Sequence, residues 1–67
     1  MLDPDIKVTR QYEDARLGDD SRPVKIIRVE FRVGTFGPFA EHFPKEEYSA
    51  QMRDDALNAF ARQVRTS

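Results

Sequence analysis

The stretch from Val24 to Val33 constrains the fold of this chain more than any other feature, because apolar and charged residues alternate along it. A period of two is typical of a β-strand that packs one face on a core and turns the other to solvent. β-Branched and aromatic residues hold most of the apolar positions, which favours a strand over a helix. The predicted core face consists of Ile27, Val29, Phe31 and Val33, and the outer face of Ile26, Arg28, Glu30 and Arg32.

Another predicted strand precedes this one and begins at Ile6. Ile6, Val8 and Tyr12 alternate with polar residues, so we expect their side chains to share the core face of the sheet. Leu17 falls on the opposite phase, which predicts a bulge or an early strand end beyond Tyr12. Residues 18–23 combine Gly, Asp, Ser and Pro and are predicted to form the turn between the two strands.

The third predicted strand is short. Gly34–Pro38 is rich in residues that interrupt strands, so we expect a hairpin loop of about five residues there. Residues 39–43 follow as a strand in which Phe39 and Phe43 face the core. The run ends at Pro44, because proline has no backbone N–H to donate.

The C-terminal part of the chain changes to a helical period. Ser49 is a plausible N-cap for a helix over residues 50–64. Apolar residues recur every three or four positions and form one stripe, as in a helix that packs on a core. The members of this stripe are Met52, Ala56, Leu57, Phe60, Ala61 and Val64.

The order β-β-β-α predicts an α+β fold, in which a three-stranded antiparallel β-meander packs against one C-terminal α-helix. We expect a single small domain over residues 1–67, with strands at 6–17, 24–33 and 39–43, a helix at 50–64 and a flexible lead-in at 1–5. The predicted core is Ile6, Val8, Tyr12, Ile27, Val29, Phe31, Val33, Phe39, Phe43, Met52, Ala56, Leu57, Phe60 and Val64.

Composition excludes the usual covalent and metal supports of a small domain. The 67 residues include no cysteine and one histidine, which rules out disulfides and disfavours a zinc site. A chain of this length buries only about 60% of its unfolded surface, so its stability is expected to be marginal. We therefore expect another protein surface to supply part of the stability.

No residue pattern predicts catalysis or a bound cofactor. His42 stands beside Glu41, but neighbouring residues on a strand point to opposite faces, so they cannot act as a pair. The adjacent carboxylates elsewhere lack the alternate spacing of a calcium loop. Gly34 and Gly37 resemble part of a phosphate-binding loop, but a strand follows them and not a helix. We expect no enzyme activity, no metal and no cofactor.

Partner binding is the remaining expectation, and the outer face of the sheet is its predicted site. Basic residues there would suit nucleic acid, but Glu30 stands among them, no aromatic accompanies them in the pattern, and the net charge is −1. Phe36 is expected at a loop tip, either folded over the core or inserted into a partner. Glu41 either lies at the edge of the sheet, beyond the cover of the helix, or places its charge in contact with a partner. The predicted partner-binding residues are Lys25, Arg28, Glu30, Arg32, Phe36, Glu41 and His42.

Two segments of the chain resemble small proteins encoded among the virion genes of tailed bacteriophages. They read Val29-x-Phe31-x-Val33-Gly34-Thr35-Phe36-Gly37-Pro38-Phe39 and Phe43-Pro44-Lys45-Glu46-Glu47-Tyr48-Ser49, the second followed by the predicted helix. The resemblance covers residues 24–65 and implies a particle component: a capsid decoration or cement protein, or a small part of the neck or tail. It implies no catalytic residues.

The expected function is therefore that of a non-enzymatic virion protein that contacts other virion proteins or copies of itself. The alternative is a small cytoplasmic adaptor or inhibitor that binds one host protein. Acids stand where a signal peptide would be basic, and no apolar run is long enough to cross a membrane. We expect assembly into a virion in the host cytoplasm, without secretion by a signal peptide, and neither a membrane nor a small-molecule substrate as partner.

Overall fold

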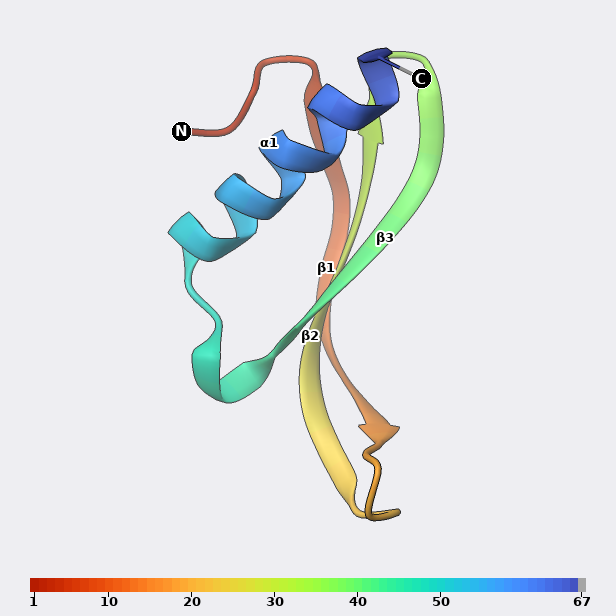
Figure 1. The fold of residues 1–67 in the computed structure, drawn as a ribbon, viewed down its shortest axis with the longest axis vertical. Coiled ribbons are helices and arrows are strands. Elements are labelled where there is room, and N and C mark those ends of the chain that lie inside the picture. The colour runs from red at the N-terminus through yellow and green to blue at the C-terminus, as the bar shows by residue number, and fades with distance from the viewer. Residues whose placement is uncertain (67) are drawn as a thin grey trace.

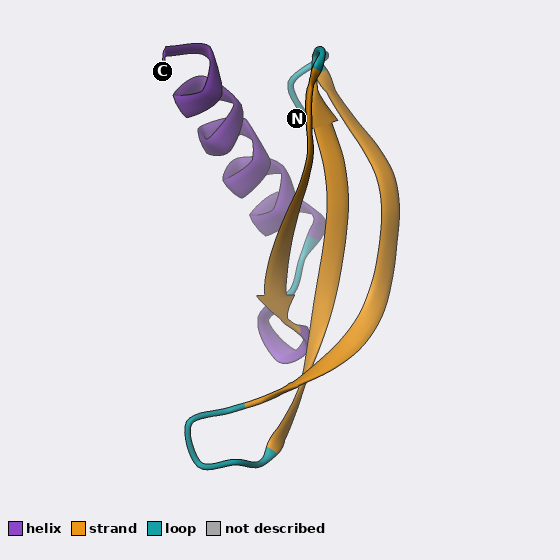
Figure 2. Ribbon diagram, turned by 90° about the vertical axis from the view of Figure 1, so that its right-hand side faces the viewer, coloured by secondary structure: helices purple, strands orange, loops and turns teal. Residues whose placement is uncertain are grey.

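A computed structural model describes residues 1–66 and confirms the predicted α+β fold class. Three antiparallel strands form one sheet in the order β1-β2-β3, and a single C-terminal helix crosses one of its faces (Figures 1 and 2). A short 3₁₀ turn, η1, connects the sheet to the helix. The elements are β1 (Ile6–Leu17), β2 (Pro23–Val33), β3 (Phe36–Pro44), η1 (Lys45–Glu47) and α1 (Ala50–Thr66).

The core lies between α1 and the upper half of the sheet in Figure 1. Val29, Phe31 and Leu57 are 0% exposed and form its centre. Phe60 packs edge-on against Phe31 and Phe39, with ring centroids 5.3 and 4.7 Å apart. Edge-to-face contacts of this kind stabilise a core beyond the burial of their area. The predicted core face of β2 is therefore present, with Val29, Phe31 and Val33 buried and Ile27 partly buried against the core cluster.

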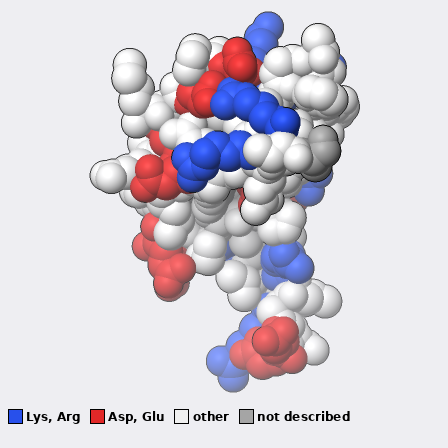
Figure 3. Space-filling view, turned by 45° about the horizontal axis from the view of Figure 1, so that its top comes forward, with Lys and Arg blue, Asp and Glu red and all other residues white. Residues whose placement is uncertain are grey.

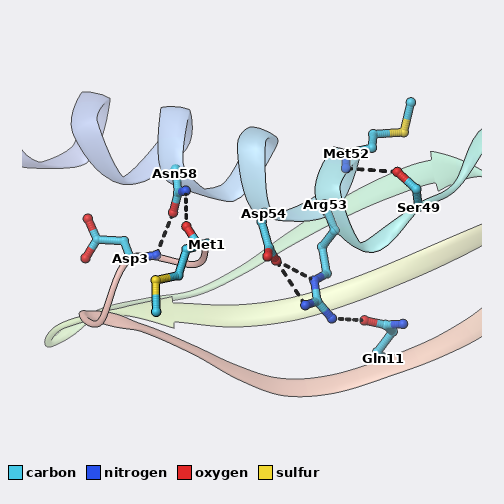
Figure 4. Close-up of polar contacts among 8 residues, drawn as sticks. All are labelled: Met1, Asp3, Gln11, Ser49, Met52, Arg53, Asp54 and Asn58. Carbon is cyan, nitrogen blue, oxygen red and sulfur yellow. Dashed lines mark hydrogen bonds and ion pairs between the residues drawn. The ribbon is translucent and has the colours of Figure 1, made fainter.

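The helix begins where Ser49 predicts, because its Oγ accepts a hydrogen bond of 3.0 Å from the backbone N–H of Met52 (Figure 4). The assignment of Met52 to the core is wrong, since 37% of this residue is exposed. The helix crosses the sheet obliquely, and its first turn lies beside the strands and not over them (Figure 1). The buried residues of α1 are Leu57 and Ala61, further along the same stripe.

The N-terminal segment, for which the sequence predicts a flexible lead-in, lies against α1. Asn58 donates from Nδ2 to the carbonyl of Met1 at 2.8 Å and accepts at Oδ1 from the N–H of Asp3 at 2.7 Å (Figure 4). Leu2 packs against the core cluster between these two contacts. The first residues thus add a cover over the core that the periodicity of the strands and helix does not reveal.

A β-bulge in β1 changes which residues face the core. Val8 pairs with Phe31, whereas the next paired residue is Arg10, opposite Glu30, so Thr9 is the extra residue. The side-chain phase of β1 therefore inverts after Val8. The prediction that Tyr12 belongs to the core is wrong, because Tyr12 pairs with Arg28 and lies on the face away from α1. The expected bulge or strand end beyond Tyr12 is absent, because β1 pairs without a further shift as far as Leu17, and the bulge lies before Tyr12.

The turn between β2 and β3 is tighter than predicted. Only Gly34 and Thr35 form the turn, and β3 begins at Phe36, which pairs with Val33. The predicted five-residue loop is therefore wrong, and the third strand is longer than residues 39–43. A second register shift follows, in which Gly37 takes a φ of 118°. The strand β3 continues past Gly37 because glycine tolerates a positive φ.

Candidate protein-binding face

The sheet face opposite α1, called here the outer face, is strongly basic. After the bulge, β1 adds outward-pointing residues to those predicted on β2, and five basic side chains stand against two acidic ones. The outer face thus has a net charge of +3. The rest of the chain has six basic and ten acidic side chains, a net charge of −4, which with the outer face gives the total of −1. The outer charged residues are Lys7, Arg10, Arg16, Arg28, Arg32, Asp14 and Glu30.

A connected polar cluster orders the centre of the outer face. Glu30 accepts at Oε2 from the hydroxyl of Tyr12 and from Nε of Arg28, both at 3.3 Å. The guanidinium of Arg10 lies 4.4 Å from the centre of the Tyr12 ring, within the range of a cation–π contact. Thr9, the bulge residue, donates from Oγ1 to the carbonyl of Glu30 at 3.1 Å. Glu30 therefore organises side chains from both β1 and β2.

An apolar depression lies on the outer face toward the β1–β2 hairpin. Ile26 is 8% exposed although no helix covers it, because its strand neighbours Asp14 and Pro44 flank it on both sides. Ile26 lines two adjoining cavities of about 300 and 250 Å³, both also lined by Arg16 and His42. The depression thus offers an apolar floor at Ile26 with a polar rim of mixed charge, which includes Arg16, Asp14 and Asp19.

The structure divides the residues predicted to bind a partner between the two faces. Arg28, Glu30 and Arg32 lie on the outer face, and His42, opposite Arg28, lies there too. The placement of Lys25 on the outer face is wrong. Lys25 has the phase of Ile27, so its ammonium lies on the helix side, 4.0 Å from a carboxylate oxygen of Glu13.

Phe36 and Glu41 also lie on the helix side of the sheet. Phe36 pairs with the buried Val33 at the sheet end and is 56% exposed, so it occupies the start of a strand and not a loop tip. Glu41 pairs with Val29 and has the core-facing phase, as its position between Phe39 and Phe43 predicts. Within residues 1–66, Glu41 is half-buried and makes no ion pair.

Ion pairs balance much of the charge on the helix side, where acidic and basic side chains are interspersed (Figure 3). Arg65 donates to Asp3 at 2.8 Å, and this bond together with the N–H of Asp5 lowers the pKa of Asp3 below its usual 3.8. Lys45 donates to Glu13 at 2.9 Å and lowers the pKa of that carboxyl below 4.5. The outer face has no comparable supply of acids.

The outward-facing residues of β1 are not among the residues predicted to bind a partner, although they form part of the candidate face. One signal could have found them: Arg10 occupies a core position if Ile6 and Val8 are extended at a period of two. A buried unpaired arginine is energetically costly, so a charged residue in that phase indicates a break in the alternation. The break inverts the phase of the following residues, which include Tyr12 and Arg16.

Residues 1–66 contain no group of three or more His, Cys, Asp or Glu side chains placed to hold a metal ion. The described part of the chain also has no helix long and apolar enough to cross a membrane. Comparisons with known proteins were negative at all three levels: no family model, no curated protein and no solved structure matches this chain.

Proposed function

We propose that this protein is a non-enzymatic assembly component that binds other proteins through the outer face of its sheet. The observation that carries this proposal is the ordered cluster around Glu30, where Tyr12, Arg10 and Arg28 are held in place on a face that α1 leaves uncovered. Interfaces are enriched in tyrosine and arginine, whose large side chains contribute contact area as well as hydrogen bonds.

The apolar depression beside this cluster supports the same proposal. Ile26 and Val24, of which Val24 is 41% exposed, line this depression together with the polar side chains of Arg16, Asp19 and His42. An apolar centre surrounded by polar groups is the usual composition of a protein-binding patch. A partner that covered Val24 would also add apolar burial to a domain whose own core is small.

The resemblance to small virion proteins supports a more specific role, as a structural part of a tailed-phage particle. Such a part works by repeated contacts with neighbouring subunits and needs no catalytic site. The resemblance covers β2, β3 and α1, the elements that supply most of the core and part of the outer face.

Nucleic acid is a second candidate partner, favoured by the net charge of +3 on the outer face. Two contacts argue against it. Glu30 places a negative charge at the centre of the face, and Arg10 covers the ring of Tyr12, which a base would need for stacking. Protein is therefore the partner that this chemistry fits better.

The test is incorporation into particles produced by cells that encode the chain. We expect purified particles to contain the chain in a fixed number of copies, measured by quantitative mass spectrometry. The double substitution Lys7→Glu with Arg32→Glu should abolish incorporation. It reverses two positive charges that lie opposite each other on β1 and β2, and it leaves the cluster at Glu30 intact. The matched control, Arg22→Glu with Arg62→Glu, reverses two exposed basic residues that lie outside the outer face and should be incorporated normally.

Circular dichroism of each variant separates lost contacts from lost folding. Normal incorporation of the folded Lys7 and Arg32 variant would refute the assignment of the outer face. Absence of the wild-type chain from particles, together with stable capture of one host protein, would replace the virion role by that of an adaptor.

A further inference from the structure

The sheet has two edge strands, β1 and β3, because only β2 is paired on both sides. An edge strand turns alternate backbone N–H and C=O groups toward a side where no strand pairs with them. In β3, Pro38 and Pro44 have no N–H to donate, and the pairing with β2 shifts register at Gly37. The edge of β3 is therefore poorly suited to accept another strand.

The edge of β1 is longer and more regular. Its twelve residues include neither proline nor glycine, and nine of them are exposed. Beyond the bulge at Thr9, the pairing with β2 runs from Arg10 to Leu17 without a further shift. Within residues 1–66, no other strand lies along this edge (Figure 2). β1 can therefore accept a strand from another molecule.

The charges of β1 are complementary to those of a second β1. When two such strands run antiparallel about a twofold axis at Tyr12, Arg10 of each copy lies opposite Asp14 of the other. Both side chains belong to the outer face, since both have the phase of Tyr12. Arg10 contacts the ring of Tyr12 and Asp14 accepts from the N–H of Ala15, and neither makes an ion pair within residues 1–66. Both charges are thus available to a second copy.

Two neighbouring registers are less favourable. An axis at Glu13 places two glutamates opposite each other and Arg10 opposite Arg16. An axis at Gln11 brings the bulge residue Thr9 into the pair and leaves Arg10 without an acid opposite it. Opposite charges stabilise a strand pair when they face each other, and like charges destabilise it. The first register is therefore favoured over both.

An axis at Ala15 is the remaining competitor, because it places Asp14 opposite Arg16. It also places Glu13 opposite the apolar Leu17, and an alanine pair replaces the tyrosine pair at its centre. Aromatic pairs across strands contribute more than alanine pairs do. Arg10 takes part in one of these two registers and Arg16 in the other, so reversal of each charge distinguishes them.

We propose that the edge of β1 binds the same edge of a second copy, antiparallel about a twofold axis at Tyr12, so that two sheets join into one of six strands. A twofold axis perpendicular to the sheet places both helices on one side and both outer faces on the other. The joined outer faces then form one continuous basic surface. This contact uses the edge of the sheet, whereas the proposed function uses its outer face.

The experiment measures the mass of the full chain by sedimentation equilibrium at increasing protein concentration. The average mass should rise to twice that of the chain and no further. Arg10→Glu or Asp14→Arg should each weaken the dimer at least about tenfold, because each places two pairs of like charges opposite each other. The matched control is Arg16→Glu, a reversal on the same face of the same strand outside residues 10–14, and it should leave the dimer intact.

Mixing the two reversed variants provides the decisive measurement. In a pair formed by one Arg10→Glu chain and one Asp14→Arg chain, both positions again hold opposite charges. An equimolar mixture should therefore dimerise, although neither variant does so alone. The double variant with both substitutions should also dimerise with itself. Circular dichroism of each variant confirms that a loss of the dimer reports the contact and not the fold.

Hydrogen exchange locates the contact. Amides within residues 10–14 should exchange more slowly at high protein concentration, where the dimer is populated, and those of β3 should not change. Protection along β3 without protection along β1 would refute the assignment of the edge.

Three further results would overturn the proposal. The first is a wild-type chain that stays monomeric up to about 1 mM, well above the range of typical specific interfaces. The second is a dimer that Arg16→Glu weakens and Arg10→Glu does not. The third is a mass that rises beyond that of a dimer, since a twofold contact is closed. Incorporation of a monomeric wild-type chain into particles would leave the proposed function standing and remove only the dimer.

Discussion

The hydroxyl of Tyr12 donates a hydrogen bond of 3.3 Å to Oε2 of Glu30 across the outer face of the sheet. The contact exists because the bulge at Thr9 inverts the phase of β1 and turns Tyr12 away from the core. The same inversion places Arg10 and Arg16 on that face. One extra strand residue thus produces a basic surface on a chain whose total charge is nearly balanced.

Removal of the Tyr12 hydroxyl tests this contact. Tyr12→Phe should lower the free energy of unfolding by about 1 kcal/mol, because it leaves one acceptor site of Glu30 without its donor. The matched control is Tyr48→Phe, since the Tyr48 hydroxyl makes no hydrogen bond to residues 1–66 and its ring packs on Phe43. Urea denaturation measures both, and equal effects would contradict the contact.

Two positions of the predicted apolar stripe should respond differently to truncation. Leu57→Ala should cost about 2–5 kcal/mol, because Leu57 is fully buried and its removal leaves a cavity. For a domain this small, that is a large part of the total stability. Met52→Ala should cost less than about 1 kcal/mol, because Met52 is already in contact with solvent. Thermal melts followed by circular dichroism measure both, and a Met52 effect as large as that of Leu57 would refute the described path of α1.

Two glycines with positive φ should also differ. A Cβ at Gly37 would lie 3.3 Å from the carbonyl oxygen of Phe31 and from the backbone N of Phe39, neither of which can move freely. At Gly34 a Cβ would meet nothing within 4 Å. We expect Gly34→Ala to cost about 1 kcal/mol for its conformation alone and Gly37→Ala to cost more. Denaturant midpoints compare the two, and the reverse order would contradict the geometry of the β3 bulge.

Titration of Asp3 should depend on Arg65. In the wild type the Asp3 carboxyl should titrate below 3.8, because the guanidinium of Arg65 stabilises its charged form. Arg65→Gln should raise this pKa toward 3.8, whereas Arg62→Gln should not, since Arg62 makes no ion pair with the described residues. Carboxyl chemical shifts followed by NMR as a function of pH measure the effect.

The same pair predicts how acid affects the fold. The folded-state pKa of Asp3 lies below the unfolded-state value, so the unfolded chain binds more protons in acid. The contribution of the contact to stability is therefore fully present above pH 3.8 and is lost as the pH falls through the lower, folded-state pKa. Acid should loosen the N-terminal segment from α1, and hydrogen exchange at the amide of Asp3 reports it. Unchanged exchange there across this range would contradict the prediction.

The elements and their order could be predicted because each depends on local periodicity. The alternation in β2 predicted its core face at Val29, Phe31 and Val33, and the helical stripe predicted the burial of Leu57. The cap at Ser49 could be predicted because it needs only a hydroxyl beside the first turn. These properties follow from neighbours within about one helical turn or one strand.

Most of the errors have a common cause, since they depend on contacts between segments distant in sequence. Tyr12 was assigned to the core because the pairing of β1 with β2 decides where the phase inverts, and Arg10 was the one local sign of that inversion. The error at Lys25 was local instead, since Lys25 shares the phase of Ile27. Met52 has the correct period, but the crossing direction of α1 decides that it lies beside the sheet. Asn58 stands outside the predicted apolar stripe of the helix, and only the structure shows that it holds the N-terminal segment.

The sequence by itself thus determined the secondary structure, the fold class and most of the core, because the hydrophobic period specifies which face of each element leaves water. Only the tertiary structure decided which charges share a surface. That outcome depends on strand register, where a shift of one residue moves every later side chain to the other face. The basic outer face, which is the candidate site, exists because the pairing of β1 with β2 absorbs Thr9 as an extra residue.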